Sequence, residues 1–428
     1  MKLRISNLGV IETMEIDMAK PFILFAGDNG TGKTYASTFL YCLIKNFASQ
    51  LLLQFSKDEK QLPASKQTKT GWEGNLDANE LYNTFLAILK TRKKRILEMM
   101  NLNIREDNFK CELITSTEEW SEELKKKEVQ KSSTSIKILK KGKNNNYSIA
   151  ATEQFDKTRA QVILLMSLYF DNIIGTHFLP AERNGIYTFS KELSIGRLRD
   201  PDIMTSNRYP RPIADGLANA EDLANAKKRQ SKFYILADEI ENDLLHGHLS
   251  VTDDGDIQFA INGKDNISIN ESSSAIKTLA PIVFYIRHIA NSSILLFIDE
   301  PELNLHPKNQ ILLAKIFVKM INAGLRLVIS THSDYIIREI NNMIMADALT
   351  KVGSDLPEKQ GYDKSLCLSS DLFSPYLFEV GKRGKVTVKP LDVDRYGFSM
   401  PSIDEAINRQ NEVTDTLYEV LKYDYPNE

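Results

Sequence analysis

The sequence is poor in the residues and segments that mark several large classes of protein. It has three cysteines, Cys42, Cys111 and Cys367, and their wide spacing suggests neither a disulfide framework nor a zinc site. No apolar run reaches the ~18 residues that a membrane-spanning helix needs. Residues 1–5 alternate in polarity instead of opening a signal peptide's long apolar segment. The sequence therefore predicts a cytoplasmic protein that has no membrane partner.

A strong excess of one charge is also missing. The formal net charge is −3, with 26% charged and 42% hydrophobic residues, which is ordinary for a soluble globular chain. A nucleic-acid partner would therefore have to be met by a local basic patch. The 428 residues exceed the ~250–300 at which a single core stops growing, so we expect two lobes or a domain with a large insertion.

The clearest motif in the sequence is Gly27–Thr34, which fits the phosphate-binding loop (P-loop) pattern G-x-x-x-x-G-K-[ST] at every required position. An apolar strand is expected over residues 22–26 before it, and helical periodicity runs from Tyr35 to about Phe55 after it. Such a strand, loop and helix are the setting that a P-loop requires. The plainer alternative is a glycine turn that merely ends a strand.

The P-loop residue types suit triphosphate binding. The glycines let backbone N–H groups turn towards phosphate oxygens at the positive end of the following helix. Lys33 would reach the β- and γ-phosphates, and the Thr34 hydroxyl would hold Mg²⁺. The residues expected to bind the nucleotide here are Asn29, Gly30, Thr31, Gly32, Lys33 and Thr34.

A second candidate for the site is the apolar run 294–298 that ends in Asp299 and Glu300. This pattern predicts a parallel strand buried on both faces, whose carboxyl end opens towards a ligand. Asp299 is expected to hold Mg²⁺, and Glu300 to accept a proton from the attacking water. A charged turn that merely follows a strand is the alternative.

Two further segments place polar residues near this edge. Residues 325–330 form a second expected strand, which delivers His332 as a candidate contact to the γ-phosphate. Ser273 and Ser274 precede a predicted helix, and such a helix start is either an anion site or a plain cap. The loop with Glu182 and Arg183 follows an apolar run, and it is either a charge clamp for a nucleotide or a salt-bridged surface turn.

The segment 57–156 differs in composition from the rest of the chain. It is polar, and we interpret it as a mainly helical insertion, with a loop over residues 56–78 and a helix over 79–101. The basic run 92–95 is either a solvated helix face or a contact for nucleic acid or a partner. Residues 376–380 and 385–389 are expected to pair as a hairpin, followed by a terminal helix from Ser402.

The order of these motifs resembles that of the ABC-type ATPases of the RecF, SMC and OLD kind. Among them, the sequence is most similar to the compact AAA-family ATPases of bacterial anti-phage defence, such as AriA of PARIS and PtuA of Septu. The resemblance implies an α/β P-loop NTPase of the ABC-ATPase type, with an N-terminal β-rich subdomain, a parallel core sheet and the insertion described above. It also implies ATP and Mg²⁺ as ligands.

The resemblance assigns further roles. Ser273 and Ser274 match the signature motif, which reaches the γ-phosphate bound by the other protomer of a head-to-head dimer. Residues 303–306 match the D-loop, and His332 matches the switch histidine. Ala275 departs from the family's usual glycine, and Glu182 stands where a glutamine is expected in the Q-loop.

We therefore predict an ATPase head over residues 1–56 and 157–345, an insertion over 57–156, and a C-terminal hairpin and helix extension over 346–428. The predicted function is ATP hydrolysis in a dimerising switch that controls a separate toxin or nuclease effector during phage infection. The alternative is a DNA-repair or DNA-end-binding ATPase, for which DNA is a partner. A transporter motor is disfavoured by the long insertion and the degenerate signature, and a C-terminal nuclease on the Asp392 and Asp394 pair by the short space.

Overall fold

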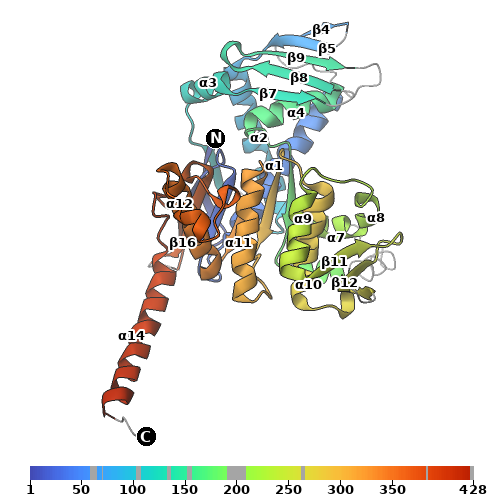
Figure 1. Cartoon of the computed structure of the whole chain (residues 1–428). Helices are drawn as coiled ribbons and strands as arrows, with labels where there is room; N and C mark the ends of the chain where they lie inside the picture. The colour runs from blue at the N-terminus through green and yellow to red at the C-terminus, as the bar shows by residue number, and fades with distance from the viewer. Residues whose placement is uncertain are drawn as a thin grey trace.

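The computed structural model describes residues 1–57, 65–69, 71–102, 108–132, 136–151, 157–189, 209–261, 266–381 and 384–424. Within these residues a nine-stranded sheet forms the centre, and helices pack on both of its faces (Figure 1). A smaller sheet from the predicted insertion lies at one end of the molecule, and the helix α14 (Pro401–Asp424) projects at the other.

The central sheet has a parallel half and a mixed half. In spatial order its strands are β10 (Gly175–Leu179), β14 (Ile294–Asp299), β15 (Arg326–Thr331), β3 (Phe22–Gly27), β16 (Phe373–Val380), β17 (Val386–Pro390), β2 (Ile11–Asp17), β1 (Lys2–Leu8) and β6 (Lys110–Leu113). The first five are parallel to one another, whereas β16 and β17, β2 and β1, and β1 and β6 pair antiparallel. The predicted parallel core and β-rich N-terminus are both confirmed.

The central strands are buried on both faces because their sequences are continuous apolar runs. In β3, Ile23 and Phe25 join the core on one face, while Phe22, Leu24 and Ala26 join the core on the other. Buried residues of α1 (Lys33–Lys57), α2 (Ala78–Met99) and α4 (Lys157–Tyr169) complete the first core. Those of α9 (Tyr234–Ile240), α10 (Ser274–Phe284), α11 (Pro307–Asn322) and α12 (Asp334–Lys351) complete the second.

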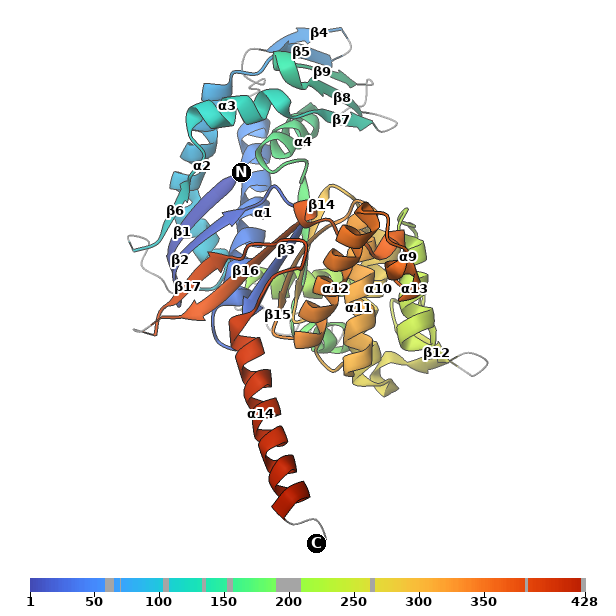
Figure 2. The ribbon, with the colours of Figure 1, turned by 60° about the vertical axis from the view of Figure 1, so that its left-hand side comes forward.

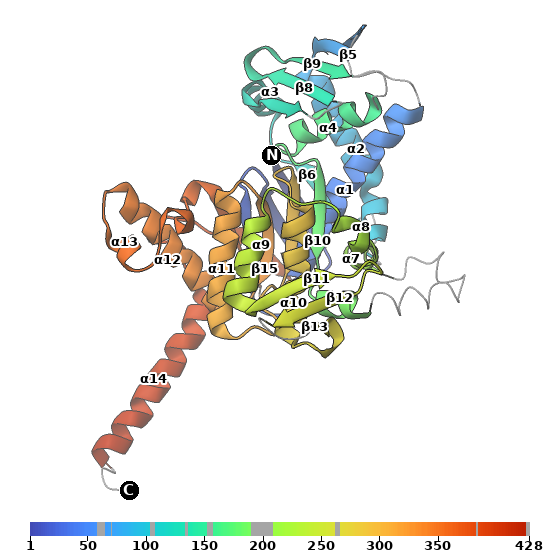
Figure 3. The same ribbon diagram turned by 45° about the vertical axis from the view of Figure 1, so that its right-hand side comes forward.

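Shorter elements connect these layers, and Figure 3 shows several of them from the side of α9 and α10. One of them is the antiparallel hairpin of β11 (Gly247–Val251) and β12 (Ile257–Ile261). The others are β13 (Asn266–Ser268), α7 (Arg211–Glu221), α8 (Leu223–Ala226), α13 (Leu356–Lys359), the 3₁₀ turns η1 (Gly142–Asn144), η3 (Ile269–Glu271), η5 (Lys364–Leu366) and η6 (Ser370–Leu372), and the π-helical turns η2 (Glu241–Leu245) and η4 (Tyr285–Ile289).

The insertion is helical only in part. Besides α2 and α3 (Thr117–Lys126) it holds a five-stranded antiparallel sheet, and its strand β6 joins the central sheet. The loop prediction for residues 56–78 is wrong, because β4 and β5 lie there. The strands of this five-stranded sheet are short and largely polar, with Trp72 as a buried anchor. The alternation of apolar and polar residues that marks a strand is therefore weak in the sequence. In order they are β4 (Ser65–Thr68), β5 (Gly71–Asn75), β9 (Asn146–Ala151), β8 (Ile136–Lys141) and β7 (Val129–Ser132).

The predicted C-terminal hairpin is confirmed, but its description as an extension of the head is wrong. The strand β16 lies directly beside β3, and β17 lies beside β2, so the hairpin joins the two halves of the central sheet (Figure 2). Aromatic contacts hold it there: the ring centroids of Phe22 and Phe373 are 5.0 Å apart, and those of Phe25 and Phe378 are 5.3 Å apart. Aromatic pairs of this kind stabilise a core beyond the area that they bury.

Candidate functional site

The carboxyl ends of β3, β14 and β15 meet at one edge of the parallel sheet, where ligands bind in folds of this type. A cleft of about 530 Å³ lies at this edge. It brings the P-loop together with the predicted catalytic residues Glu300 and His332. The cleft is lined by Val10, Asn29, Gly30, Gly32, Lys33, Thr34, Tyr35, Glu300, Leu303 and His332.

The P-loop backbone can take its shape only with glycine at two tightly packed positions. Gly27 has φ of 143°, and a Cβ there would lie 2.6 Å from the carbonyl oxygen of Phe378 in β16. Gly32 has φ of 91°, and a Cβ there would lie 2.9 Å from the Val10 side chain. L-residues with a side chain rarely adopt such angles. The C-terminal hairpin and the N-terminal strands therefore help to shape the loop.

Two side chains fasten the loop from inside. The Lys33 ammonium donates hydrogen bonds of 2.8 Å to the carbonyl oxygens of both Gly27 and Asp28, and the Thr31 hydroxyl donates one of 2.8 Å to Asp28. Burial lowers the pKa of Lys33, while the carboxylates of Glu300, Asp299 and Glu302 act in the opposite direction. Because the Lys33 ammonium lines the cleft, it is placed to contact an anionic ligand there.

Asp299 is joined to the P-loop as the sequence predicts. The Thr34 hydroxyl donates a 2.8 Å hydrogen bond to Oδ2 of Asp299, and the Ser330 hydroxyl donates to its Oδ1. Burial raises the pKa of Asp299, those two hydrogen bonds lower it, and the charge of Glu300 raises it further. A buried carboxylate in this position is costly unless a cation compensates it.

Glu300 occupies a strained backbone position. Its φ of 45° lies in the left-handed region, which residues other than glycine seldom adopt. Its backbone N–H donates a 2.9 Å hydrogen bond to the carbonyl of Ser330 on the neighbouring strand. The bend turns the chain out of β14 and leaves the side chain partly exposed at the cleft. Strain of this kind is concentrated at functional sites, where the surrounding structure maintains it.

Arg183 fixes this bend, a role that the sequence did not reveal. The guanidinium is fully buried and donates to four carbonyl oxygens: Asp299 at 2.7 Å, Glu300 at 3.0 Å, Pro180 at 3.1 Å and Thr278 at 3.2 Å. The interpretation as a salt-bridged surface turn is therefore wrong. Burial lowers the pKa of Arg183 to about 10, against the pull of the nearby carboxylates. The residue thus ties β14 to the start of α10 and to the end of β10.

Glu302 is a second residue that the sequence left without a role of its own. It is buried, and its Oε1 accepts hydrogen bonds from the Thr331 hydroxyl at 2.7 Å and from the His332 backbone N–H at 2.9 Å. The same oxygen lies 3.3 Å from Nδ1 of His332, whereas Oε1 of Glu300 lies 3.9 Å from that nitrogen. Glu302 therefore orients the histidine towards the cleft. Its position two residues after Glu300 was the only signal in the sequence.

Some predicted residues do not line this cleft. Ser273 and Ser274 are exposed at the start of α10, where the Ser273 hydroxyl accepts a 3.4 Å hydrogen bond from the N–H of Ile276. His306 caps the start of α11. Glu182 is exposed on the loop after β10, and its charge contributes to the raised pKa of Asp299. The roles of these residues stay predictions.

The donor set fits Mg²⁺ better than a transition metal. No cluster of three or more His, Cys, Asp or Glu side chains able to hold a metal occurs in the described part of the chain. Thr34, which lines the cleft, and the buried Asp299, which accepts its hydrogen bond, instead provide a hydroxyl and a carboxylate already in contact. Mg²⁺ bound with nucleotides commonly takes one or two protein ligands and completes its shell with phosphate and water.

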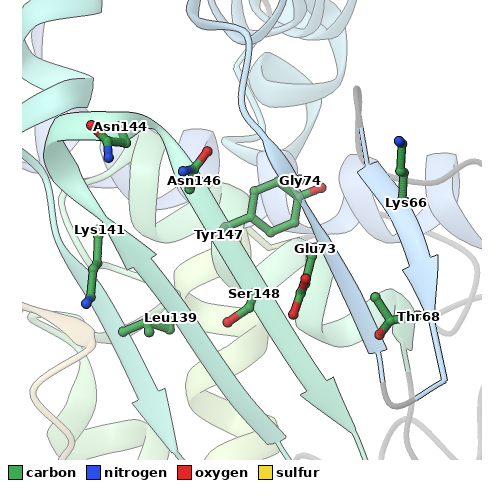
Figure 4. Close-up of a pocket in the computed structure, with 10 residues that line it drawn as sticks. All are labelled: Lys66, Thr68, Glu73, Gly74, Leu139, Lys141, Asn144, Asn146, Tyr147 and Ser148. Carbon is green, nitrogen blue, oxygen red and sulfur yellow. The ribbon is translucent and has the colours of Figure 1, made fainter.

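A larger hollow of about 740 Å³ lies elsewhere, on the insertion sheet (Figure 4). Its lining includes Lys66, Lys141 and Glu73, with neutral polar side chains between them. Lys66 and Lys141 come from opposite sides of the hollow, so their charges do not converge on one point. It contains none of the motif residues, and the smaller cleft at the P-loop is the better candidate for chemistry.

Comparison with known proteins agrees with this assignment at the level of the family. Residues 1–337 of the 428 match the model of a protein family described as "AAA ATPase domain". None of the curated proteins compared with the chain matches it. No helix within the described ranges is both long and apolar enough to cross a membrane.

Three solved structures that are similar to the chain are SMC heads. One is the SmcHead bound to the C-winged helix domain of ScpA, with 12% identity, a TM-score of 0.37, and coverage of 92% of this chain and 98% of that one. Another is an Smc head domain with an extended coiled coil, bound to the C-terminal domain of ScpA from Pyrococcus furiosus. It has 11% identity and a TM-score of 0.34, and the match covers 96% of this chain and 98% of that one. The SMC head domain from Thermotoga maritima has 10% identity and a TM-score of 0.33, and the match covers 92% of this chain and 98% of that one. At such values the likeness says nothing about activity or partners.

Proposed function

Since this chain belongs to the AAA ATPase domain family, we propose that it binds ATP with Mg²⁺ in the P-loop cleft and hydrolyses it. The observation that carries the proposal is the 2.8 Å hydrogen bond between Thr34 and Asp299, which joins two motifs 265 residues apart. Glu300 and His332 line the same cleft. The two carboxylates and the glycine loop thus converge on one place, as hydrolysis of a triphosphate requires.

Binding uses polar and apolar parts of the cleft. The amides of Asn29, Gly30 and Gly32 and the Lys33 ammonium meet the phosphates. Val10, which packs beside Gly32, and the ring of Tyr35 offer apolar surface to the rest of the nucleotide. Thr34 and Asp299 would hold Mg²⁺, which when bound neutralises part of the phosphate charge.

Glu300 is proposed as the general base. Its carboxylate accepts a proton from water while the water oxygen forms a bond to the γ-phosphorus. The bond from that phosphorus to the β,γ-bridging oxygen breaks, and its electron pair leaves with ADP. Arg183 holds the Glu300 backbone through its carbonyl, and Glu302 orients His332 towards the γ-phosphate.

We further propose that ATP drives two heads together as a switch. Support comes from the exposed start of α10, where Ser273 and Ser274 face solvent instead of their own P-loop. Each protomer would then supply these serines to its partner's nucleotide, as the resemblance implies. The switch would control a separate toxin or nuclease effector in anti-phage defence.

The alternative, a DNA-repair or DNA-end-binding ATPase, depends on the basic run of α2. Lys94 and Arg95 are exposed there, but Arg95 pairs with Glu98 at 3.1 Å and Arg92 donates to Gln50. Glu98 thus offsets the charge of Arg95 at the helix surface and Arg92 is held against α1, so only part of the basic run is available to DNA, which favours the switch. DNA-stimulated hydrolysis that falls steeply with salt would support the alternative instead.

Purified full-length protein provides the test. We expect Lys33→Ala to abolish binding of a fluorescent ATP analogue, because the variant loses the buried cation of the loop. Glu300→Gln should keep ATP binding and lower kcat about 10²- to 10⁴-fold, the usual contribution of a general base. It should also trap an ATP-bound oligomer. Glu358→Gln, on the exposed surface of α13, is the matched control and should hydrolyse normally.

Two outcomes would count against the assignment. If Glu300→Gln hydrolyses ATP at the wild-type rate, Glu300 is not the base. If Lys33→Ala binds ATP as tightly as the wild type, the cleft is not the nucleotide site. Native mass spectrometry with and without ATP then tests the switch separately, since a head that hydrolyses ATP but never dimerises would retain only the first part of the proposal.

A further inference from the structure

The helix α14 carries an apolar surface that none of the residues described by the structure covers. The helix projects away from the body in all three ribbon views (Figures 1 to 3). Every residue from 408 to 423 is exposed. The large apolar side chains on it include Val413, 51% exposed, Leu417, 60%, and Leu421, 64%. Isolated helices are marginal in water, and most helical stability in proteins comes from packing of an apolar face.

Three of the exposed apolar side chains follow the seven-residue repeat of a coiled coil. Val413 and Val420 occupy the d position and Leu417 the a position, with Leu421 beside them at e. Gln410 occupies the preceding a position, and the exposed Tyr418 and Tyr423 fall at b and g. The helix has 24 residues, which is about three heptads and roughly 36 Å. This length is enough for a short pairing seam.

The distribution of charge permits a second copy of this chain as the partner. In a parallel pair, the acidic residues Glu412 and Glu419 fall at c and Asp415 at f, all away from the seam. The g and e positions that face each other pair Arg409 with Thr414 and Thr416 with Leu421, so no like charges meet there. Asp424, the last residue of the helix, falls at an a position, so like charges meet only at the end of the seam.

The polar residue Gln410 in the seam also favours pairing between identical helices. An amide offers both a donor and an acceptor, so two Gln410 side chains at facing a positions can bond to each other. A polar a residue beside the apolar part of the seam also sets the register, because any shift would bury an unpaired amide. We propose that two copies of the chain pair through α14 in a parallel, in-register coiled coil, independently of nucleotide.

Such a pair would raise the local concentration of the two heads. A weak ATP-dependent contact between heads would then become an intramolecular event, which strengthens it without any new contact in the cleft. The seam involves no residue of the P-loop cleft, so its failure and the failure of the ATPase assignment are distinguishable. The tests below are made on the full chain without nucleotide.

Cysteine cross-linking reads out the orientation and the register. Facing a positions bring two Cα atoms within the range that a disulfide can bridge, whereas f positions lie on opposite outer sides. We expect Leu417→Cys to form a disulfide-linked dimer under mild oxidation, and Asp415→Cys to stay monomeric on a non-reducing gel. Wild-type protein controls for Cys42, Cys111 and Cys367, of which only the last is partly exposed.

Sedimentation equilibrium reads out the assembly. Wild-type protein should show an association between one and two times 48.6 kDa, and Leu417→Glu should weaken it at least tenfold. The matched control, Glu419→Gln at a c position, should associate as the wild type does. A monomeric wild type at 100 µM, equal cross-linking at positions 415 and 417, or binding of α14 only to a different protein would each overturn the proposal.

Discussion

His177 lies at the centre of a prediction about acid stability. It belongs to β10, the edge strand that leads into the Arg183 loop, and its ring packs on Tyr285 with centroids 4.7 Å apart. The side chain is buried, and no hydrogen-bond partner of Nε2 is found among the described residues. Burial, reinforced by the charge of Lys45, lowers the pKa of His177 to about 4. The folded protein therefore keeps this ring neutral.

The sign and size of the effect follow from linkage. Below pH 6.5 the unfolded chain binds a proton at this histidine that the folded chain does not bind until about pH 4. The stability contributed by the neutral ring is present above pH 6.5 and is lost as the pH falls towards 4. These two pKa values remove about 2 kcal/mol between pH 7.5 and pH 5.

The substitution His177→Phe removes the titration and keeps an aromatic ring against Tyr285. Urea unfolding of both proteins at pH 7.5 and pH 5 isolates the effect, because the other titrating groups cancel in the difference. We expect the wild type to lose about 2 kcal/mol relative to the variant on going to pH 5. His246→Asn is the control, since His246 is exposed and its left-handed backbone suits asparagine.

A difference in the free energy of unfolding that is the same at both pH values would refute this reasoning. It would mean that His177 is not buried as a neutral ring, or that water reaches it. A difference of the opposite sign would mean that a carboxylate, of which Asp215 is the nearest candidate, holds the protonated form. Either result would also mean that β10 does not make the sheet edge beside the Arg183 loop sensitive to acid.

Two further predictions concern the cleft. Asp299→Asn should raise the free energy of unfolding of the nucleotide-free protein at pH 8, and this gain should shrink at acidic pH. The raised pKa of Asp299 makes its charged form the costly one in the folded protein, and that cost builds up as the pH rises from the unfolded pKa to the folded pKa. The same variant should lose ATP hydrolysis, and urea unfolding with a phosphate-release assay checks both effects. Arg183→Met should cost about 3 kcal/mol and lower kcat more than ATP affinity, since four buried carbonyls lose their donor outside the cleft. Equal losses in kcat and affinity would mean that Arg183 does not act through Glu300.

Local sequence determined the parts of the site whose chemistry requires a fixed spacing. The P-loop is recognisable because glycines, lysine and threonine must stand at set intervals between a strand and a helix. The strand before Asp299 is recognisable because burial on both faces demands a continuous apolar run. For the same reason the parallel arrangement of β14, β15 and β3 could be predicted, whereas the roles of Ser273 and Ser274 rest on resemblance and remain predictions.

Only the tertiary structure decided which distant segments complete the site. The strand β16 lies beside β3 although some 350 residues separate them, and no local pattern specifies a partner at that distance. Arg183 acts through backbone carbonyls, which every residue possesses, so its partners leave no trace in the sequence. Spacing and polarity thus determined the chemistry of the cleft, and the packing of the sheet decided what holds that chemistry in place.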